Sequence, residues 1–284
     1  MTTKQPVALV TGASSGIGLA TAQLLSDAGY QVYGTSRRGG PVDNLHFTML
    51  QLDVTSDESV EAAVNAVLRL HGRIDLLVNN AGFGVAPAGA EESSMAQASA
   101  IFETNFFGLV RMTRAVLPHM RRQGGGRIIN IGSVLGFLPA PFAALYAATK
   151  HAVEGYSESL DHEVRSKGIR VSVVEPAYTK THFDANLLAA DMPIKEYRAT
   201  SAQVEEALRR AFSKGDDPSV VANVVLKAAT AARPKVRYVA GRVARVLRVL
   251  RRFGPAGLID SGIRRDLDLD KIATPLAGLP ATRN

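Results

Sequence analysis

The chain has 284 residues, of which 46% are hydrophobic and 21% charged, a composition typical of a globular protein that buries a sizeable core. It contains no cysteine, which excludes disulfide scaffolds, thiol catalysis and cysteine-based zinc sites. The six scattered histidines show no paired ligand spacing, so we expect no metal. The net charge of +7 comes from the C-terminal tail, because residues 233–284 hold 12 Lys and Arg against 4 Asp. This tail has few aromatic residues, so we expect no nucleic-acid partner.

The N-terminal residues lack the charged leader and long apolar stretch of a secretory signal, which predicts a cytoplasmic location. A charge-free run between Arg127 and Lys150 is long enough to span a bilayer, but it includes Gly136, Pro139 and Pro141. A buried strand followed by a loop fits this run better.

Short apolar runs alternate with longer helical stretches, which is typical of βαβ units around a parallel sheet. We expect strands at Val7–Thr11, Gln31–Thr35, His46–Gln51, Ile74–Asn79, Arg127–Ile131 and Ile169–Glu175. Helices are expected near Ile17–Ala28, Asp57–Leu70, Ala98–Arg122 and Ala143–Lys167. After Pro176 a polar, helix-prone stretch reaches about Gly215, and a helix near Pro218–Ala232 and a strand at Val236–Ala240 follow. The pattern predicts a doubly wound α/β sheet.

A glycine-rich turn, Thr11–Gly18, leads from the first strand directly into a helix. Gly12 permits a tight turn, Gly16 lets the backbone approach a pyrophosphate, and Gly18 allows close helix packing. Glycines alone also make ordinary turns, but the strand before and the helix after supply the context of a dinucleotide site. The fold expected is therefore of the Rossmann type.

Tyr146 and Lys150 lie four residues apart in a helical stretch, so they share one helix face. A neighbouring ammonium favours the ionised form of tyrosine, which makes the pair a candidate for proton transfer. Most such pairs are ordinary surface residues. This pair differs because it follows the uncharged strand and Ser133.

These motifs resemble the short-chain dehydrogenase/reductase family, in the branch with TGxxxGxG and YxxxK, over about residues 6–181. Supporting matches are Asp53 in LDVT, Asn79–Gly82, Asn105 in TNFFG and Ser133 in IGSVLG. The resemblance implies that Tyr146 is the acid/base, that Lys150 binds the nicotinamide ribose and lowers the tyrosine pKa, and that Ser133 holds the substrate oxygen. Asn105 would support a water that connects Lys150 to solvent. Each of these residues, taken singly, also has a structural explanation. Ser133 would cap a turn, Asn105 would bond to the helix backbone, and Asp53 would form a turn at the end of a strand.

The resemblance also implies a set of cofactor-binding residues along the strand ends. Besides Tyr146 and Lys150, we expect these to be Gly12, Ser14, Ser15, Gly16, Ile17, Gly18, Ser36, Arg37, Arg38, Asp53, Val54, Asn79, Ala81, Gly82, Pro176 and Thr181. The chain departs from the family at Ala177, where the family has glycine, and this predicts a slightly displaced loop on the nicotinamide side.

The end of the second strand indicates which nicotinamide is used. An NAD enzyme presents an acid there to the ribose hydroxyl, whereas this chain has Ser36 followed by Arg37. Arginine can make a charge-assisted contact with a 2′-phosphate, so NADP(H) is favoured over the alternative of a solvated arginine pair.

The chain more loosely resembles the subgroup that contains 17-beta-hydroxysteroid and retinol dehydrogenases, in the segments VYGTSRR and VVEPAYTKT and in the tail. This looser resemblance implies a lipophilic ketone or alcohol as substrate. We expect one domain over residues 1–284, with a substrate-binding insertion at 177–217 and a basic extension at 241–284. Helices 98–122 and 143–167 are the usual pairing faces, so the resemblance implies a homodimer or homotetramer. Alternatives are a non-catalytic dinucleotide sensor or scaffold, and an isomerase or dehydratase on the same fold.

Residues 242–253 form a basic amphipathic pattern, with arginines on one arc and Val243, Val246, Leu247, Leu250 and Phe253 on the other. We favour a helix whose apolar stripe closes the substrate cleft or packs on a partner subunit, with its arginines in solvent. The alternative is that this helix rests on an anionic membrane surface.

Overall fold

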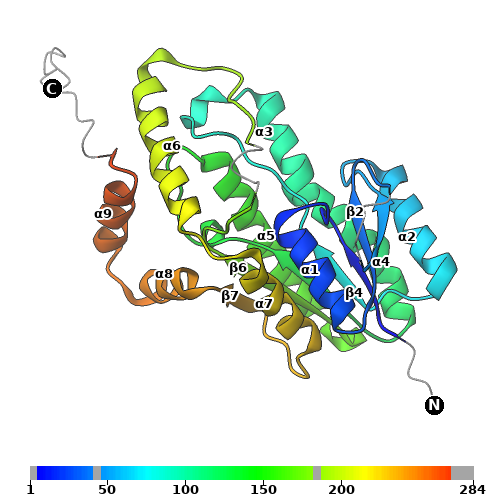
Figure 1. The fold of residues 1–284 in the computed structure, drawn as a ribbon. Helices are drawn as coiled ribbons and strands as arrows, with labels where there is room; N and C mark the ends of the chain where they lie inside the picture. Colours follow the sequence, from blue (N-terminus) through cyan, green and yellow to red (C-terminus); the bar gives the residue numbers. More distant parts are fainter. Residues whose placement is uncertain (1–4, 41–45, 182–186, 270–284) are drawn as a thin grey trace, which may run out of the picture.

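The computed structural model describes residues 5–40, 46–181 and 187–269. The segment 182–186 of the expected insertion and the segment 270–284 of the expected extension lie outside the described residues. Within the described part, seven parallel strands form one sheet in the order β3-β2-β1-β4-β5-β6-β7 (Figure 1). The strands are β1 Val7–Val10, β2 Gln31–Ser36, β3 Thr48–Gln51, β4 Leu76–Asn79, β5 Gly126–Ile131, β6 Ile169–Pro176 and β7 Arg237–Ala240.

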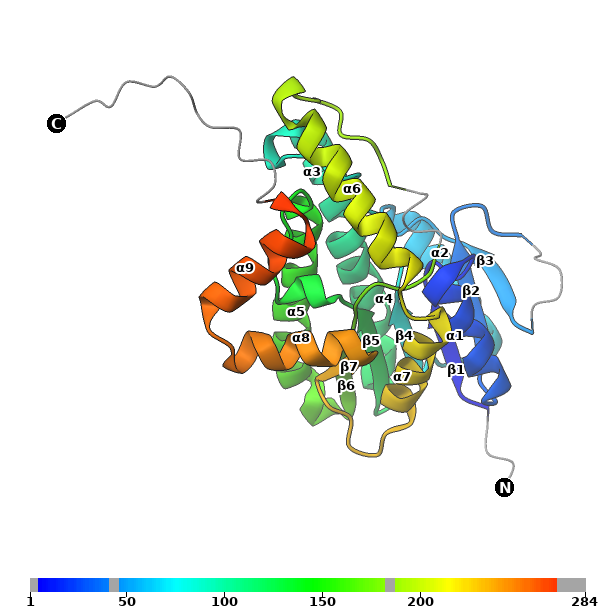
Figure 2. The ribbon, with the colours of Figure 1, turned by 60° about the vertical axis from the view of Figure 1, so that its left-hand side comes forward.

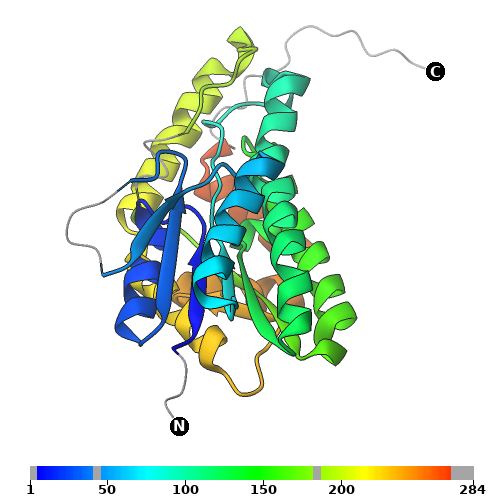
Figure 3. The same cartoon turned by 90° about the vertical axis from the view of Figure 1, so that its right-hand side faces the viewer.

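Helices cover both faces of this sheet (Figure 1 and Figure 3). They are α1 Gly16–Asp27, α2 Asp57–His71, α3 Met95–Phe102, α4 Gly108–Arg122, α5 Ala144–Val164, α6 Arg198–Ser213, α7 Pro218–Thr230, α8 Arg242–Phe253 and α9 Ala256–Asp266. Apolar side chains of α1 and α7 fill the core on one face, and those of α2, α4 and α5 fill it on the other. This architecture confirms the predicted Rossmann-type doubly wound sheet.

The strand order reverses between β1 and β4, since β1 pairs with β2 on one side and with β4 on the other. In an open parallel sheet, ligands bind beyond the carboxyl ends of the strands at such a switch point. The glycine-rich turn follows β1 and therefore lies at this position.

Helix formation differs from the sequence prediction in two places. The single helix expected at 98–122 consists of α3, a π-helical turn η2 (Glu103–Phe107) and α4. Such π turns are rare and frequently mark functional sites. Helix α9 was not predicted from the sequence, because its apolar residues are few and its N-terminus has no side-chain cap among the described residues.

Residues 242–253 form the expected helix, α8, but its packing differs from the prediction of a closed cleft and solvated arginines, while packing on a partner subunit stays a prediction. Val243 and Phe253 of the apolar stripe are exposed and close no cleft, whereas Leu247 packs against the protein. Arg248, expected in solvent, pairs with the buried Glu175. No helix of the described residues is long and apolar enough to cross a membrane.

Candidate active site

The glycine turn between β1 and α1 has the shape of a phosphate cradle. Gly12 and Gly16 adopt φ values of +66° and +55°, which side chains other than glycine rarely adopt. A Cβ on Gly18 would lie 2.2 Å from the carbonyl oxygen of Gly12, so the turn and the helix could not approach as they do. Ser15, the N-cap of α1, caps no amide with its side chain among the described residues. The first amides of α1 can therefore receive an anionic group, which fits a dinucleotide pyrophosphate.

A brace of hydrogen bonds from the end of β4 holds this turn in place. The side-chain amide of Asn80 donates to the carbonyl oxygens of Thr11 (2.9 Å) and Gly12 (3.1 Å). The hydroxyl of Thr11 accepts from the backbone amides of Asn80 and Ala81. We define Thr11 and Asn80 as the turn brace. Sequence reasoning placed Ala81 at the site but missed the roles of these two residues, although both stand within the quoted motifs.

The ends of β2 and β3 carry the residues expected to meet the adenosine. Arg37 and Arg38 are exposed, and the hydroxyl of Ser36, at the end of β2, accepts from the amide of Gly39. Asp53 accepts from both the amide and the hydroxyl of Thr55, and these bonds hold the pKa of its carboxyl below the ordinary value.

The structure thus gives Asp53 the turn-forming role that we considered for it. Its neighbour Val54 buries its side chain in the core against Gly108, so only the Val54 main chain remains for the expected cofactor contact.

Tyr146, Lys150 and Ser133 gather at the carboxyl end of β5. Tyr146 and Lys150 lie on the first two turns of α5, and the Lys150 ammonium donates to the carbonyl oxygen of Ile131 at 2.8 Å. Ile131 ends β5 two residues before Ser133, so this bond anchors the lysine beside the serine. Lys150 Nζ lies 5.6 Å from the centroid of the Tyr146 ring. The Ser133 hydroxyl, 9% exposed, accepts from the amide of Leu135 and caps a short 3-10 turn, η3 (Val134–Gly136).

Burial sets the protonation of the tyrosine and lysine. It raises the pKa of Tyr146 well above the ordinary value, and it lowers the pKa of Lys150 to about 8. That Lys150 lowers the tyrosine pKa when the nicotinamide is bound stays a prediction, because burial is the cause that sets the direction of the Tyr146 pKa here. At neutral pH the site holds a neutral phenol beside an ammonium group.

Asn105 lies in the π turn and clamps the loop that follows β4. Its side chain accepts from the amide of Phe83 at 2.9 Å and donates to the carbonyl oxygen of the same residue at 2.8 Å. It also lies 3.4 Å from the hydroxyl of Thr149, the residue before Lys150. The side chain of Asn105 therefore ties the π turn to the catalytic helix. A Cβ on Gly82 would meet Asn105 Oδ1 at 3.0 Å, so this glycine permits the close approach.

Asn79, which was expected to border the ribose, is buried within the protein. Its side-chain amide donates to Asn130 Oδ1 (2.9 Å) and to Thr113 Oγ1 (3.2 Å). These bonds join β4, β5 and α4, so the side chain supports the sheet, as we also expected of this stretch, and its place beside the ribose stays a prediction. Its nearest motif neighbour, Asn80, is the residue that acts on the glycine turn.

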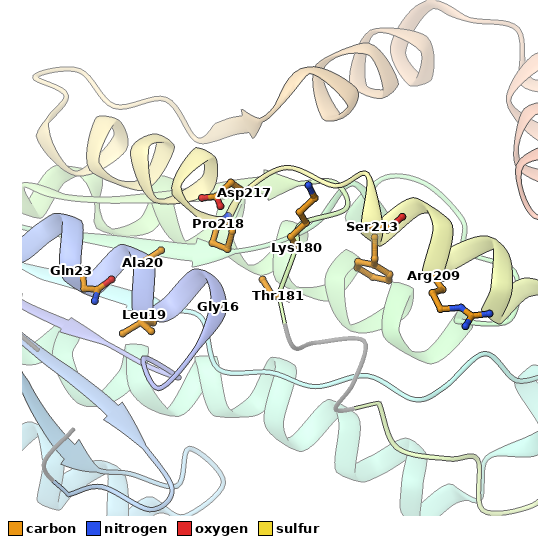
Figure 4. Close-up of a pocket in the computed structure, with 11 residues that line it drawn as sticks. Gly16, Leu19, Ala20, Gln23, Lys180, Thr181, Arg209, Ser213, Asp217 and Pro218 are labelled. Atoms are coloured by element: carbon orange, nitrogen blue, oxygen red, sulfur yellow. The ribbon is translucent and has the colours of Figure 1, made fainter. Parts of the chain in front are cut away.

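The loop after β6 returns to the glycine turn. Thr181 lies so close to Gly16 that a Cβ on the glycine would be 3.1 Å from the threonine Cβ. Ala177, the departure from the family pattern, has no positive φ and packs against the buried cluster of Val134, Leu138 and Ala244. The residue after Pro176 thus needs no glycine here. A cavity of about 590 Å³ opens beside Gly16 and Thr181, with Lys180 and Arg209 on its wall (Figure 4).

A buried cluster of charges lies behind the catalytic helix, and sequence reasoning missed it. Arg237 Nε contacts Glu154 Oε2 at 2.8 Å, and Arg248 Nη1 contacts Glu175 Oε1 at 2.9 Å. Glu154 is 4% exposed and Glu175 is fully buried. Their other oxygens, Glu154 Oε1 and Glu175 Oε2, have no hydrogen-bond partner among the described residues, although the two carboxyl groups lie within reach of each other.

A single proton held between these carboxyl groups satisfies both orphaned oxygens. Burial and the neighbouring Glu154 raise the pKa of Glu175 to about 7, and burial also raises that of Glu154. We call Glu154 and Glu175 the carboxyl pair. Glu154 follows Lys150 by one helical turn, and this spacing within an apolar stretch was the available sequence signal.

The fold and the site together define a Rossmann-type protein with a phosphate cradle beside a tyrosine, a lysine and a serine. The family model for short chain dehydrogenase matches residues 6–191. The chain therefore belongs to the short-chain dehydrogenase family and is an oxidoreductase of that family.

Similar proteins fall in the same family. The chain is 38% identical over 244 residues to 3-ketodihydrosphingosine reductase of Bacteroides thetaiotaomicron, covering 85% of this chain and 90% of the relative. It is 38% identical over 252 residues to human retinol dehydrogenase 8, covering 81% and 79%. A short-chain dehydrogenase from Streptomyces avermitilis superposes with a TM-score of 0.80 at 32% identity, covering 96% and 98%. A metagenomic short-chain oxidoreductase in complex with NADP superposes with 0.65 at 27% identity, covering 83% and 96%.

Proposed function

We propose that this protein is an NADP(H)-dependent oxidoreductase that interconverts a carbonyl and a primary or secondary alcohol on a lipophilic substrate. The observation that carries the proposal is the placement of Lys150 on the carbonyl oxygen of Ile131, which holds an ammonium next to Tyr146 and Ser133. A sensor or scaffold needs no proton-transfer group, so this arrangement favours an enzyme.

The residues divide the reaction between them. The nicotinamide cofactor supplies or accepts the hydride when it is bound. In reduction, the Tyr146 hydroxyl donates its proton to the substrate oxygen as the carbonyl becomes an alcohol; in oxidation, the phenolate takes the proton back. The Ser133 hydroxyl accepts from Leu135 and can still donate to the same substrate oxygen. The Lys150 ammonium stabilises the phenolate that forms when the proton leaves and can donate to the cofactor ribose.

The charge at the end of β2 supports NADP(H) as the cofactor. Arg37 is exposed, and the nearby carboxylate of Asp53 is engaged with Thr55. A 2′-phosphate can therefore pair with Arg37, whereas a 2′-hydroxyl finds no acid between Ser36 and Gly40. Similar solved structures hold NADP, NADH or NAD, so they support a nicotinamide dinucleotide, and the preference for NADP(H) rests on Arg37.

Apolar side chains around the catalytic residues support a lipophilic substrate. Val134, Leu135 and Leu138 follow Ser133. A narrow crevice beside Tyr146 is lined by Val85, Ala86 and Phe142. Phe142 has a φ of 62°, a strained conformation of the kind that concentrates at functional sites. The names of two relatives, 3-ketodihydrosphingosine reductase and retinol dehydrogenase 8, support the same substrate class.

The test is a cofactor-oxidation assay of the purified protein with NADPH and with NADH, over aliphatic, aromatic, steroid and retinoid carbonyls. The proposal predicts steady NADPH consumption with lipophilic carbonyls and weaker activity with NADH. Conversion of substrate without net NADPH consumption would indicate the isomerase or dehydratase alternative, and binding of NADPH with no turnover across the panel would indicate the sensor.

A further inference from the structure

Helix α8 contacts the rest of the protein through its small and cationic side. Ala244 is fully buried in a cluster with Val134 and Leu138, and Leu247 packs against this cluster. Arg248 contacts Glu175 at 2.9 Å, and its guanidinium carbon lies 4.9 Å from the centroid of the Phe137 ring. These contacts fix which side of α8 faces inward.

The opposite side of α8 is apolar and faces away from the protein. At about 100° per residue, Val243, Val246, Val249, Leu250 and Phe253 fall in one arc centred opposite Ala244. Their exposed fractions are 50%, 52%, 55%, 39% and 76%, and Leu258 of α9 follows at 56%. We call these six residues the outer face. They make up more than half of the exposed large hydrophobic residues of the described chain, and the five on α8 share one arc of the helix, so this arc is an apolar surface that calls for a partner.

The charges around the outer face indicate what this partner is. Arg242 lies within this arc and Arg245 and Arg252 lie beside it; all three are exposed, and α8 carries no acidic residue to neutralise them. A second copy packed symmetrically on this face would bring two sets of arginines together, which is unfavourable. A lipid surface with anionic headgroups accepts both the apolar arc and the arginines, since basic amphipathic helices lie in such interfaces.

We propose that the outer face of α8 docks on an anionic membrane surface. Figure 2 shows α8 and α9 as an arm at the β7 side of the molecule, and the exposed side chains of the outer face lie on this arm. The inward side of the arm packs on the segment that begins at Ser133, and α9 packs through Ile263 near Val204 of α6. A docked protein therefore presents the substrate side of the fold near the lipid. The docking itself does not depend on the proposed chemistry.

The experiment is sedimentation of the full-length protein with vesicles of phosphatidylcholine alone and of phosphatidylcholine with phosphatidylserine. We expect binding only to the anionic vesicles, decreasing with salt. Because each basic residue at such a surface contributes about fivefold in affinity, Arg242→Gln, Arg245→Gln and Arg252→Gln together should weaken binding about 100-fold. The charge-matched control replaces the exposed Arg69, Arg121 and Arg233 by glutamine and should leave binding unchanged within about twofold.

A second pair of variants tests the apolar contribution. Val246→Gln with Phe253→Gln should abolish sedimentation with the vesicles, whereas Leu70→Gln with Met95→Gln, which are exposed elsewhere, should not. The proposal is overturned if binding ignores lipid charge, if no vesicle binds, or if the control variants lose as much. It is also overturned if equilibrium sedimentation without lipid shows a dimer that Val246→Gln with Phe253→Gln converts to monomer, since a second copy then covers the face.

Discussion

Lys150 owes its place to the end of β5, where its ammonium donates to Ile131. Burial lowers its pKa to about 8, so the ammonium form is retained at neutral pH with a margin of about one unit. The same burial keeps the Tyr146 phenol neutral. Before the cofactor binds, these two residues therefore stand in the protonation states that reduction of a carbonyl requires, a proton on the acid and a positive charge beside it.

The first prediction concerns Tyr146→Phe. This change removes the transferable proton and little packing, so turnover should fall at least about 100-fold while NADPH affinity stays within a few-fold. Steady-state kinetics and fluorescence titration of NADPH measure the two quantities. Lys150→Met should reduce both turnover and NADPH affinity, because we assign two roles to this side chain: it donates to the cofactor ribose and it stabilises the phenolate that forms when the proton leaves. Near-normal turnover in Tyr146→Phe with its best substrate would contradict the mechanism.

The second prediction concerns Arg37→Ala at the end of β2. Loss of one charge-assisted hydrogen bond should weaken NADPH binding by about 10- to 150-fold. NADH has no 2′-phosphate, so its affinity should hardly change and serves as the internal control. Titration of both cofactors decides the point. An equal loss for the two would make Arg37 a structural residue, and an initial preference for NADH would remove the basis of the assignment.

Among the elements, most strands and helices were predictable from the sequence because each is bounded by local signals. Apolar runs of strand length, glycine at the end of α2 and capping serines mark their limits without reference to the rest of the fold. The π turn was not predictable, because it depends on the bonds between Asn105 and Phe83, a loop 22 residues away. The outward orientation of α8 was also beyond sequence reasoning: amphipathicity shows that two faces exist, but the pairing of Arg248 with Glu175 decides which one faces inward.

In the candidate site, too, the features with local sequence signals were predictable, and those that depend on contacts between distant segments were not. The glycine turn and the Tyr146–Lys150 pair are each contained within one short segment, so their spacing and the strand or helix next to them in the chain identified them. Asn79 and Asn80 are neighbours in one motif that was expected to support the sheet, and the structure shows that Asn79 does so whereas Asn80 holds the glycine turn.

The third prediction tests the turn brace. Asn80→Ala removes two hydrogen bonds to the main chain of the glycine turn, so it should lower the unfolding free energy by about 1–3 kcal/mol. Because the turn cradles the part common to both cofactors, NADPH and NADH should weaken by the same factor, unlike in Arg37→Ala. Denaturant unfolding and cofactor titration measure these effects. Asn223→Ala, which removes an exposed amide bonded to its own helix, is the matched control. Unchanged stability and affinity in Asn80→Ala would exclude the brace.

At the scale of the whole molecule, the carboxyl pair connects segments that are distant in sequence. Glu154 lies on α5, one turn from Lys150, and Glu175 lies on β6. Arg237 on β7 and Arg248 on α8 contact them. The cluster therefore links the catalytic helix to the arm that carries the outer face. Gly132 and Gly136, on either side of Ser133, make room for the Glu154 side chain, since a Cβ on either would meet it within 3.0 Å.

The last prediction follows from the proton held by this pair. The pKa of Glu175 rises from 4.5 to about 7 on folding, so between these values the folded state holds a proton that the unfolded state has released. This extra proton stabilises the folded state. Its contribution to the unfolding free energy is full below about pH 4.5 and is lost as pH rises through about 7. The melting temperature should therefore fall between about pH 5 and about pH 8. Glu154→Gln removes the neighbouring negative charge, which lowers the pKa of Glu175 and should flatten this fall.

Glu158→Gln is the matched control, because Glu158 also contacts Arg237 but is 43% exposed at its side chain. Glu158→Gln also removes one negative charge beside Arg237, but it leaves the proton between Glu154 and Glu175 in place. The melting temperature of this variant should therefore fall with pH as steeply as that of the wild-type protein. Thermal unfolding of the three proteins across this range measures the effect. If Glu154→Gln keeps the wild-type slope, or if Glu158→Gln flattens it equally, the proton does not lie between Glu154 and Glu175, and the two orphaned oxygens require another donor.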